Sequence, residues 1–236
     1  MKSLLTDQIV ADDVSVRALL GLGPRGEDVG DLRQLQLAPL RGKGKLRLWM
    51  GVGMGLVAAF NMALRMPWPL VCGWLACTLI FTLWSYRIFD RLPLDDPKVA
   101  GLAEYKLCNR HALYSALVWG TPFWIEGFPP SLEHVLSIWS IALLMMLTLA
   151  IAAHSLPRAC ILFIAPVTLS AMAAMLAAGS PPLAAVAAVA GFLLSAFCVR
   201  FGRSHVRFRR AEETLHEKTE TVSLLLREFE ETSADW

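Results

Sequence analysis

The sequence predicts an all-α integral membrane protein, with a six-helix transmembrane bundle and a C-terminal cytoplasmic helix of the coiled-coil type. Three observations lead to this fold class. Hydrophobic residues make up 56% of the 236 residues, and charged residues only 18%, against about 25% in a typical soluble domain. Most of the charge lies in residues 1–47 and 200–236, and between them are apolar runs long enough to cross a bilayer. The end of the chain repeats apolar residues every seven positions, which is typical of paired helices.

Residues 1–47 form a polar N-terminal segment that we place in the cytoplasm. Within it, "SLLTDQIVADDVSVRALL" puts several apolar residues near one stripe of a helix. This piece either lies on the membrane or on a partner, or it is a loosely ordered tail. We expect no cleavable signal peptide, because the segment has no early apolar core and a full-length span follows it.

The transmembrane region is expected to cover residues 48–200. It contains six hydrophobic segments, at 48–66, 69–87, 109–125, 133–153, 158–178 and 182–200. The third segment is the shortest and contains Pro122. If it failed to span, every later segment would change direction.

The basic residues determine the expected orientation, because they gather on one side of the predicted membrane. They flank the segments on that side as follows: Arg41, Lys43, Lys45 and Arg47; Arg87, Arg91, Lys98, Lys106 and Arg110; Arg158; Arg200, Arg203, Arg207, Arg209 and Arg210. The turns on the other side contain a single basic residue, Arg65. Basic loops stay in the cytoplasm, so six spans with both termini inside are expected.

Small residues at four-residue spacing predict where helices pack closely. Gly51 and Gly55 form such a pair in the first span, and Gly191 and Ser195 form one in the sixth. Such pairs let helix backbones approach each other in lipid. They serve either tight packing within one bundle, which we favour, or a dimer face.

The spans contain almost no ionisable residue, which argues against ion-coupled transport and against acid–base catalysis inside the membrane. For sensing or packing, the candidates are Asn61, Trp119, His154 and Pro166. Pro166 is expected to kink the fifth span or to serve its packing.

No catalytic residue, cofactor or metal site is expected from the sequence. His111 and His154 are the single histidine pair at roughly matched depth for a haem, and hydrogen bonding at the interface is the favoured alternative. The five cysteines show neither a disulfide framework nor zinc-ligand spacing. A net charge of +2 is too small to indicate a nucleic-acid partner.

Residues 201–236 are expected to form a helix that transmits movement out of the membrane. Its apolar seam consists of Phe208, Leu215, Val222 and Phe229 at heptad spacing, joined by Leu225. Lys218 interrupts the seam, so isolated pairing is expected to be marginal. We further hypothesise that the loop containing Asp95 and Asp96 touches this helix, so that their replacement by lysine alters signalling.

The stretch "EKTETVSLLLREFEETSADW" resembles the junction that follows the membrane sensor in bacterial, especially alphaproteobacterial, cyclic-di-GMP signalling proteins. In that family, a multi-span sensor leads through such a helix into PAS, GGDEF and EAL domains. The resemblance implies an inner-membrane sensor module, a homodimer in the lipid bilayer, whose output domains lie beyond this chain. No GGDEF, EAL or histidine-kinase phosphorylation motif is present, so no enzymatic activity is expected of the chain itself.

Two other function classes remain open from the sequence. One is the input region of a sensor histidine kinase, because similar coiled linkers precede those catalytic domains. The other is a small transporter or channel with a regulatory tail, which predicts a polar pathway through the spans and measurable flux in proteoliposomes. The few polar residues in the spans favour the sensor over the transporter.

Overall fold

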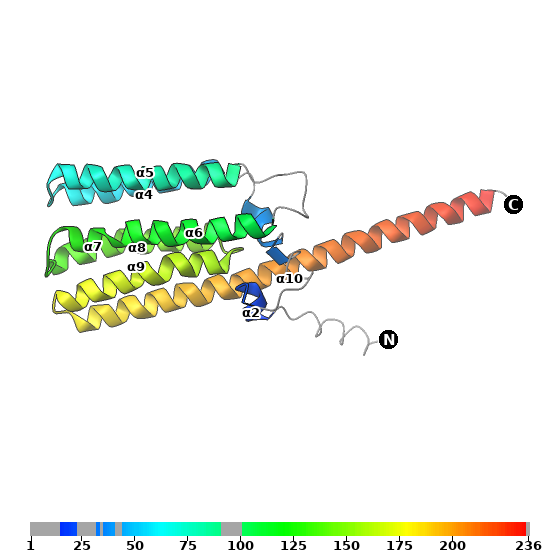
Figure 1. Ribbon diagram of the computed structural model, residues 1–236. Coiled ribbons are helices and arrows are strands. Elements are labelled where there is room, and N and C mark those ends of the chain that lie inside the picture. Colours follow the sequence, from blue (N-terminus) through cyan, green and yellow to red (C-terminus); the bar gives the residue numbers. More distant parts are fainter. Residues whose placement is uncertain (1–14, 23–31, 34, 41–43, 91–100, 235–236) are drawn as a thin grey trace.

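The computed structural model describes residues 15–22, 32–33, 35–40, 44–90 and 101–234. Every regular element within these ranges is a helix, as the sequence predicts. Figure 1 shows the long helices running side by side, with one helix extending far beyond the others. The loop with Asp95 and Asp96 lies outside the described residues, as do residues 1–14.

Four of the described helices are long and apolar enough to cross a membrane. They are α5 (Trp68–Asp90), α8 (Leu132–Ala152), α9 (Pro157–Ala177) and α10 (Pro181–Ala234). They cover the predicted second, fourth, fifth and sixth segments to within one residue. The fold class is therefore confirmed as all-helical with four candidate membrane spans.

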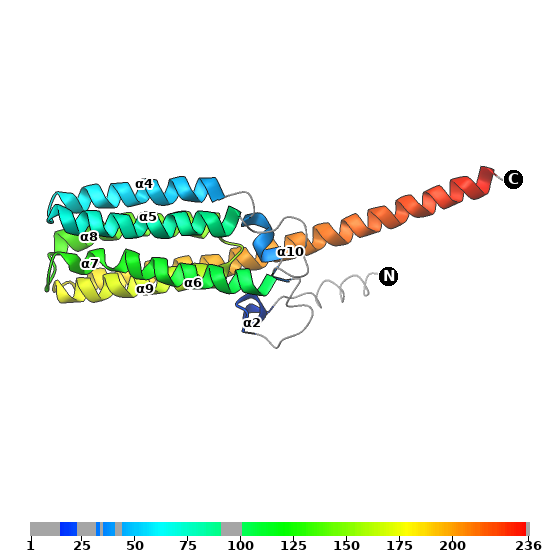
Figure 2. The same ribbon diagram turned by 45° about the horizontal axis from the view of Figure 1, so that its top comes forward.

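Two further helices lie alongside these four in Figures 1 and 2. Helix α4 (Gly44–Ala63) packs against α5 and α8, and α6 (Gly101–Gly120) packs against α5 and α9. The apolar part of α4, Leu48–Ala63, is shorter than that of the four candidate spans.

The predicted third segment, 109–125, is divided between two helices. Helix α6 begins at Gly101 and ends at Gly120, and the short helix α7 (Pro122–Ile125) follows it. The early start has a packing reason, because the buried stripe of α6 already begins at Tyr105, which is 2% exposed. The break has a chemical reason, since Pro122 has no N–H to continue the helical hydrogen bonds.

Helix α10 is the longest element, with 54 residues, which corresponds to about 80 Å at 1.5 Å per residue. Its start is fixed by a sharp turn after α9. Gly179 adopts a φ of +76°, a left-handed conformation that glycine tolerates best, and Pro181 then occupies the first helical position. From there α10 runs along α9 and then out of the bundle (Figure 1).

Three of the predicted small residues lie at close contacts between helices of the same chain. A Cβ added to Gly51 would lie 2.6 Å from Thr82 Cγ2, and one added to Gly55 would lie 3.2 Å from Thr78 Cγ2. A Cβ added to Gly191 would lie 2.5 Å from Thr168 Oγ1. These glycines therefore allow α4 to approach α5, and α10 to approach α9. The Ser195 hydroxyl donates to the Gly191 carbonyl of its own helix at 2.8 Å.

A small second core lies where α10 leaves the bundle. It consists of Leu19, Leu32, Leu35 and Val206, which we call the N-terminal cluster. Leu19 is the last residue of the short helix α2 (Val16–Leu19). The 3₁₀ helix η1 (Ala38–Leu40) begins three residues after Leu35. Helix α2 is thus packed against α10, whereas Leu37 and Leu40 belong to the main core.

Gln36 ties the N-terminal cluster together. Its side chain is 1% exposed, and its Nε2 donates to the Leu19 carbonyl at 3.0 Å.

Replacing Gln36 with leucine removes this donor and leaves the Leu19 carbonyl unpaired, which costs about 1–3 kcal/mol of stability. We expect amide hydrogen exchange in Ala18–Leu22 to accelerate at least about tenfold, as measured by mass spectrometry. Exchange within α9 should stay the same, and unchanged exchange in Ala18–Leu22 would contradict the assignment.

Candidate functional site

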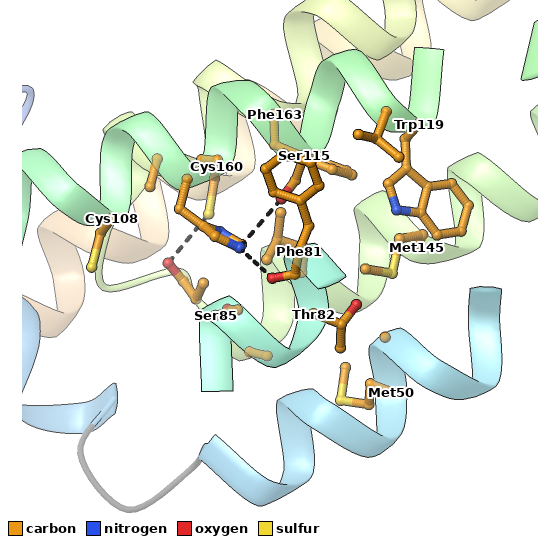
Figure 3. Close-up of a pocket in the computed structure, with 18 of the residues that line it drawn as sticks. Met50, Phe81, Thr82, Ser85, Cys108, Ser115, Trp119, Met145, Cys160 and Phe163 are labelled. Carbon is orange, nitrogen blue, oxygen red and sulfur yellow. Dashed lines mark hydrogen bonds between the residues drawn. The ribbon is translucent and has the colours of Figure 1, made fainter. Parts of the chain in front are cut away.

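A cavity of about 110 Å³ lies inside the helical assembly. Helices α4 and α5 form one wall, and α6, α8 and α9 form the other. It is lined by Met50, Gly51, Thr78, Phe81, Thr82, Ser85, Cys108, His111, Ala112, Ser115, Val118, Trp119, Met145, Leu149, Ala152, Ala153, Leu156, Ala159, Cys160 and Phe163. Most of these side chains are apolar, and Figure 3 shows ten of them labelled.

Trp119 lines the cavity at the end of α6 that leads to α7, and Trp74 packs against it. The rings of Trp74 and Trp119 meet edge to face, with centroids 5.5 Å apart. Both side chains are 5% exposed, and Trp74 Nε1 donates to the Val118 carbonyl at 2.8 Å. This hydrogen bond satisfies the indole N–H and fixes the ring that holds Trp119 in place.

His111 forms the polar part of the wall. Its Nε2 lies 2.8 Å from the Phe81 carbonyl of α5. Because a carbonyl oxygen only accepts hydrogen bonds, this nitrogen carries the proton in that contact. The ring also lies beside the aromatic rings of Phe81 and Trp84, at centroid distances of 6.4 and 5.6 Å. His111 therefore links α6 to α5 at the edge of the cavity.

Two threonines place hydroxyl oxygens along the α5 wall. Thr78 Oγ1 donates to the Trp74 carbonyl at 3.0 Å, and Thr82 Oγ1 donates to the Thr78 carbonyl at 2.8 Å. Each hydroxyl proton is thus directed to the backbone of its own helix. The lone pairs of the same oxygens remain able to accept a further hydrogen bond.

The turn between α8 and α9 forms the other end of the cavity. Ala153 and Leu156 line it from the inside. On the outside of the same turn, a Cβ added to Gly202 of α10 would lie 2.8 Å from the His154 carbonyl oxygen and 3.2 Å from Pro157 Cγ. The turn therefore lies between the cavity and the point where α10 leaves the bundle.

Of the four sequence-predicted sensing candidates, Trp119 alone lines the cavity. Asn61 is half-buried near the end of α4, and its Oδ1 has no hydrogen-bond partner among the described residues. Pro166 is half-buried within α9. His154 belongs to the α8–α9 turn, where its ring lies 5.8 Å from Phe201 and 5.3 Å from His205 of α10.

The histidine pair considered for a haem is divided between two settings. His111 contacts α5 across the cavity wall, whereas His154 contacts the base of α10. Among the described residues, no group of three or more His, Cys, Asp and Glu side chains is arranged to hold a metal ion.

The predicted coupling residues all lie on α10. Phe208, Leu215, Val222 and Leu225 are between 54% and 67% exposed, so nothing in the described chain covers them. Phe229 also lies within α10, but its side chain is outside the described residues.

Sequence analysis missed the cavity, although one signal for it was present. Thr78 and Thr82 are four residues apart on α5, and His111 and Ser115 are four residues apart on α6. Residues at this spacing share a helix face. Two polar faces in otherwise apolar helices indicate that the faces meet.

No protein-family model, curated protein or solved structure matches the chain. The fold defines it as an all-helical protein with four helices suited to membrane insertion.

Proposed function

We propose that the chain is a membrane-embedded sensory input module, which passes a stimulus through α10 to a cytoplasmic signalling output. One observation carries the proposal. Helix α10 is a single uninterrupted helix from Pro181 to Ala234. Its first half packs on α9, and its second half extends beyond the bundle with exposed apolar residues. A rigid helix of this kind carries a shift or rotation over a long distance.

In this proposal α4 and α6 also cross the bilayer, which gives six spans over residues 48–200. The packing of α4 on α5 and α8, and of α6 on α5 and α9, supports it. The apolar part of α6 begins near His111. Lys106 and Arg110 are exposed in the preceding turns, where long basic side chains reach from a helix to the lipid headgroups.

The distribution of basic residues supports a cytoplasmic location for both ends of the chain. Arg87 lies in the last turn of α5 and Arg158 in the first turn of α9. Both of these helix ends lie at the end of the bundle from which α10 leaves (Figure 1). At the opposite end, Arg65 forms an ion pair with Glu133. Basic residues are retained in the cytoplasm, so we place the module in the bacterial inner membrane with both termini inside.

The output domains that suit this module are PAS, GGDEF and EAL domains, on the strength of the resemblance of residues 217–236. A histidine kinase is the alternative output, because a paired helix joins sensor and catalytic domains in that class too. Both require that α10 pairs with its copy in a homodimer.

Cysteine crosslinking tests the pairing. Leu215→Cys and Val222→Cys are expected to form disulfides between protomers in native membranes, because these positions lie on one exposed stripe of α10. Glu220→Cys is the matched control. It is equally accessible but lies about 150° around the helix from that stripe. Equal crosslinking at Glu220 and Leu215, or none at either of the seam positions, would refute paired transmission.

A further inference from the structure

We propose that the cavity is the stimulus-binding site, and that it binds a small, neutral aromatic molecule carrying one hydrogen-bond donor. The binding site itself stands on the geometry of the cavity. Its role as the input of the module rests on the proposed function.

The size of the cavity sets the size of the ligand. A single water molecule needs about 10–15 Å³, and the cavity measures about 110 Å³. An apolar cavity of about 150 Å³ accepts benzene, so this smaller cavity admits at most a single ring. Most of its lining is apolar, and an apolar body is therefore favoured.

The lining excludes charged ligands. None of the described lining residues is Lys, Arg, Asp or Glu. A carboxylate, phosphate or ammonium group would lose its hydration without gaining a partner of opposite charge, which is costly. The ligand is therefore neutral.

Aromatic rings and sulfur atoms in the wall favour an aromatic ligand. Phe81, Phe163 and Trp119 contribute rings, and Met50 and Met145 contribute thioethers. Figure 3 shows Trp119 and Met145 on one side of the cavity and Met50 on another. Ring edges and thioethers both make favourable contacts with an aromatic face.

The α5 wall favours a ligand with a donor. Thr82 lines the cavity, and its hydroxyl proton is already directed to the Thr78 carbonyl. Its oxygen therefore offers an acceptor to the ligand. Thr78 repeats this arrangement one turn earlier. A phenol O–H has the required chemistry.

The position of the cavity connects it to the output. Its inner end is the α8–α9 turn, which Ala153 and Leu156 line from inside and which contacts Gly202 of α10 from outside. An occupant that presses on this turn shifts the base of α10. Because Gly202 already lies in close contact with the His154 carbonyl, a movement of the turn is passed on to α10.

The test uses phenol and toluene as probes, because both are single rings with one small substituent and phenol alone carries an O–H donor. Equilibrium dialysis of the full chain in lipid nanodiscs, against protein-free nanodiscs, measures saturable binding. We expect phenol to bind saturably, about fivefold more tightly than toluene, as a single hydrogen bond provides. Binding of phenol no greater than in protein-free nanodiscs would overturn the proposal, and would leave lipid chains as the occupant.

Two variants locate the binding. Ala112→Leu fills the cavity from α6 and should reduce binding of both probes at least tenfold, whereas Ala173→Leu on the exposed face of α9 should not. Thr82→Val keeps the volume but removes the acceptor, so the affinity of phenol should fall to that of toluene. Persistent preference of this variant for phenol would refute the donor assignment, even if Ala112→Leu failed to fold.

Crosslinking at Leu215→Cys separates this inference from the proposed function. We expect phenol, at a concentration near its dissociation constant, to change the crosslinking rate at least about twofold, and Ala112→Leu to remove most of that response. Phenol that binds without changing the rate would refute its role as stimulus. Saturable phenol binding in a protein that never crosslinks would overturn the proposed function and support the binding site.

Discussion

Replacing Gly191 with leucine is expected to destabilise the protein by about 2–3 kcal/mol, the upper part of the range for overpacking a buried contact. A Cβ at this position would lie 2.5 Å from Thr168 Oγ1 and 2.6 Å from Thr168 Cγ2. Thr168 is 6% exposed and branched at Cβ, so it has little freedom to turn away. The contact lies in the extensive packing of α9 against α10. A lower thermal unfolding midpoint in detergent would report the loss.

Gly73→Leu is the matched control for this prediction. Gly73 also lies inside a membrane-suited helix, but a Cβ there would meet nothing within 4 Å. Its substitution should leave the midpoint nearly unchanged. A second test pairs Gly191→Ala with Thr168→Ala, which removes both clashing atoms and should recover stability non-additively. Equal midpoints for Gly191→Leu and Gly73→Leu would mean that α9 and α10 do not pack at this contact.

The helical fold and several close packing sites were predictable from sequence because they depend on local patterns. Long apolar runs define the helices regardless of what they contact. Glycines at four-residue spacing mark a helix face that can approach another backbone, and Gly51, Gly55 and Gly191 all lie at such approaches. The partners of those glycines were not predictable. Nothing in the spacing of Gly191 indicates that Thr168, rather than a second copy of the chain, faces it.

The cavity and the N-terminal cluster were missed because both depend on contacts between distant parts of the chain. The cavity exists because the α4–α5 pair meets α6, α8 and α9 without filling the space between them. Its volume depends on side chains from five helices, and no local period encodes that arrangement. The N-terminal cluster brings Leu19 against Val206, and four isolated apolar residues give no periodic signal. Helix α6 begins before the predicted apolar segment because Tyr105 is buried by neighbouring helices, and hydropathy does not report such contacts.

Replacing Gly202 with valine is expected to change the direction in which α10 leaves the bundle. A Cβ at this position would lie 2.8 Å from the His154 carbonyl oxygen and within 3.3 Å of two Pro157 ring atoms. Neither a backbone carbonyl nor a proline ring can rotate out of the way, so α10 itself has to move. If α10 pivots at its Gly191 contact, a displacement at Gly202 grows about threefold by Ser223, at 1.5 Å per residue. A shift of roughly 1 Å at Gly202 then becomes about 3 Å at Ser223.

Electron paramagnetic resonance distances between spin labels measure this movement directly. Lys106 of α6 and Ser223 of α10 are both exposed, so labels at these positions report the angle of α10 against the bundle. Gly202→Val should shift the mean distance by about 2–3 Å on the same lever argument. Ser204→Val, which adds the same side chain at an exposed position of α10, should not. Gly202→Val should also change crosslinking at Leu215→Cys, because the apolar seam of α10 moves with the helix. If the distance between the labels stays the same in Gly202→Val, the α8–α9 turn does not press on α10, and a stimulus in the cavity has no route to the output helix.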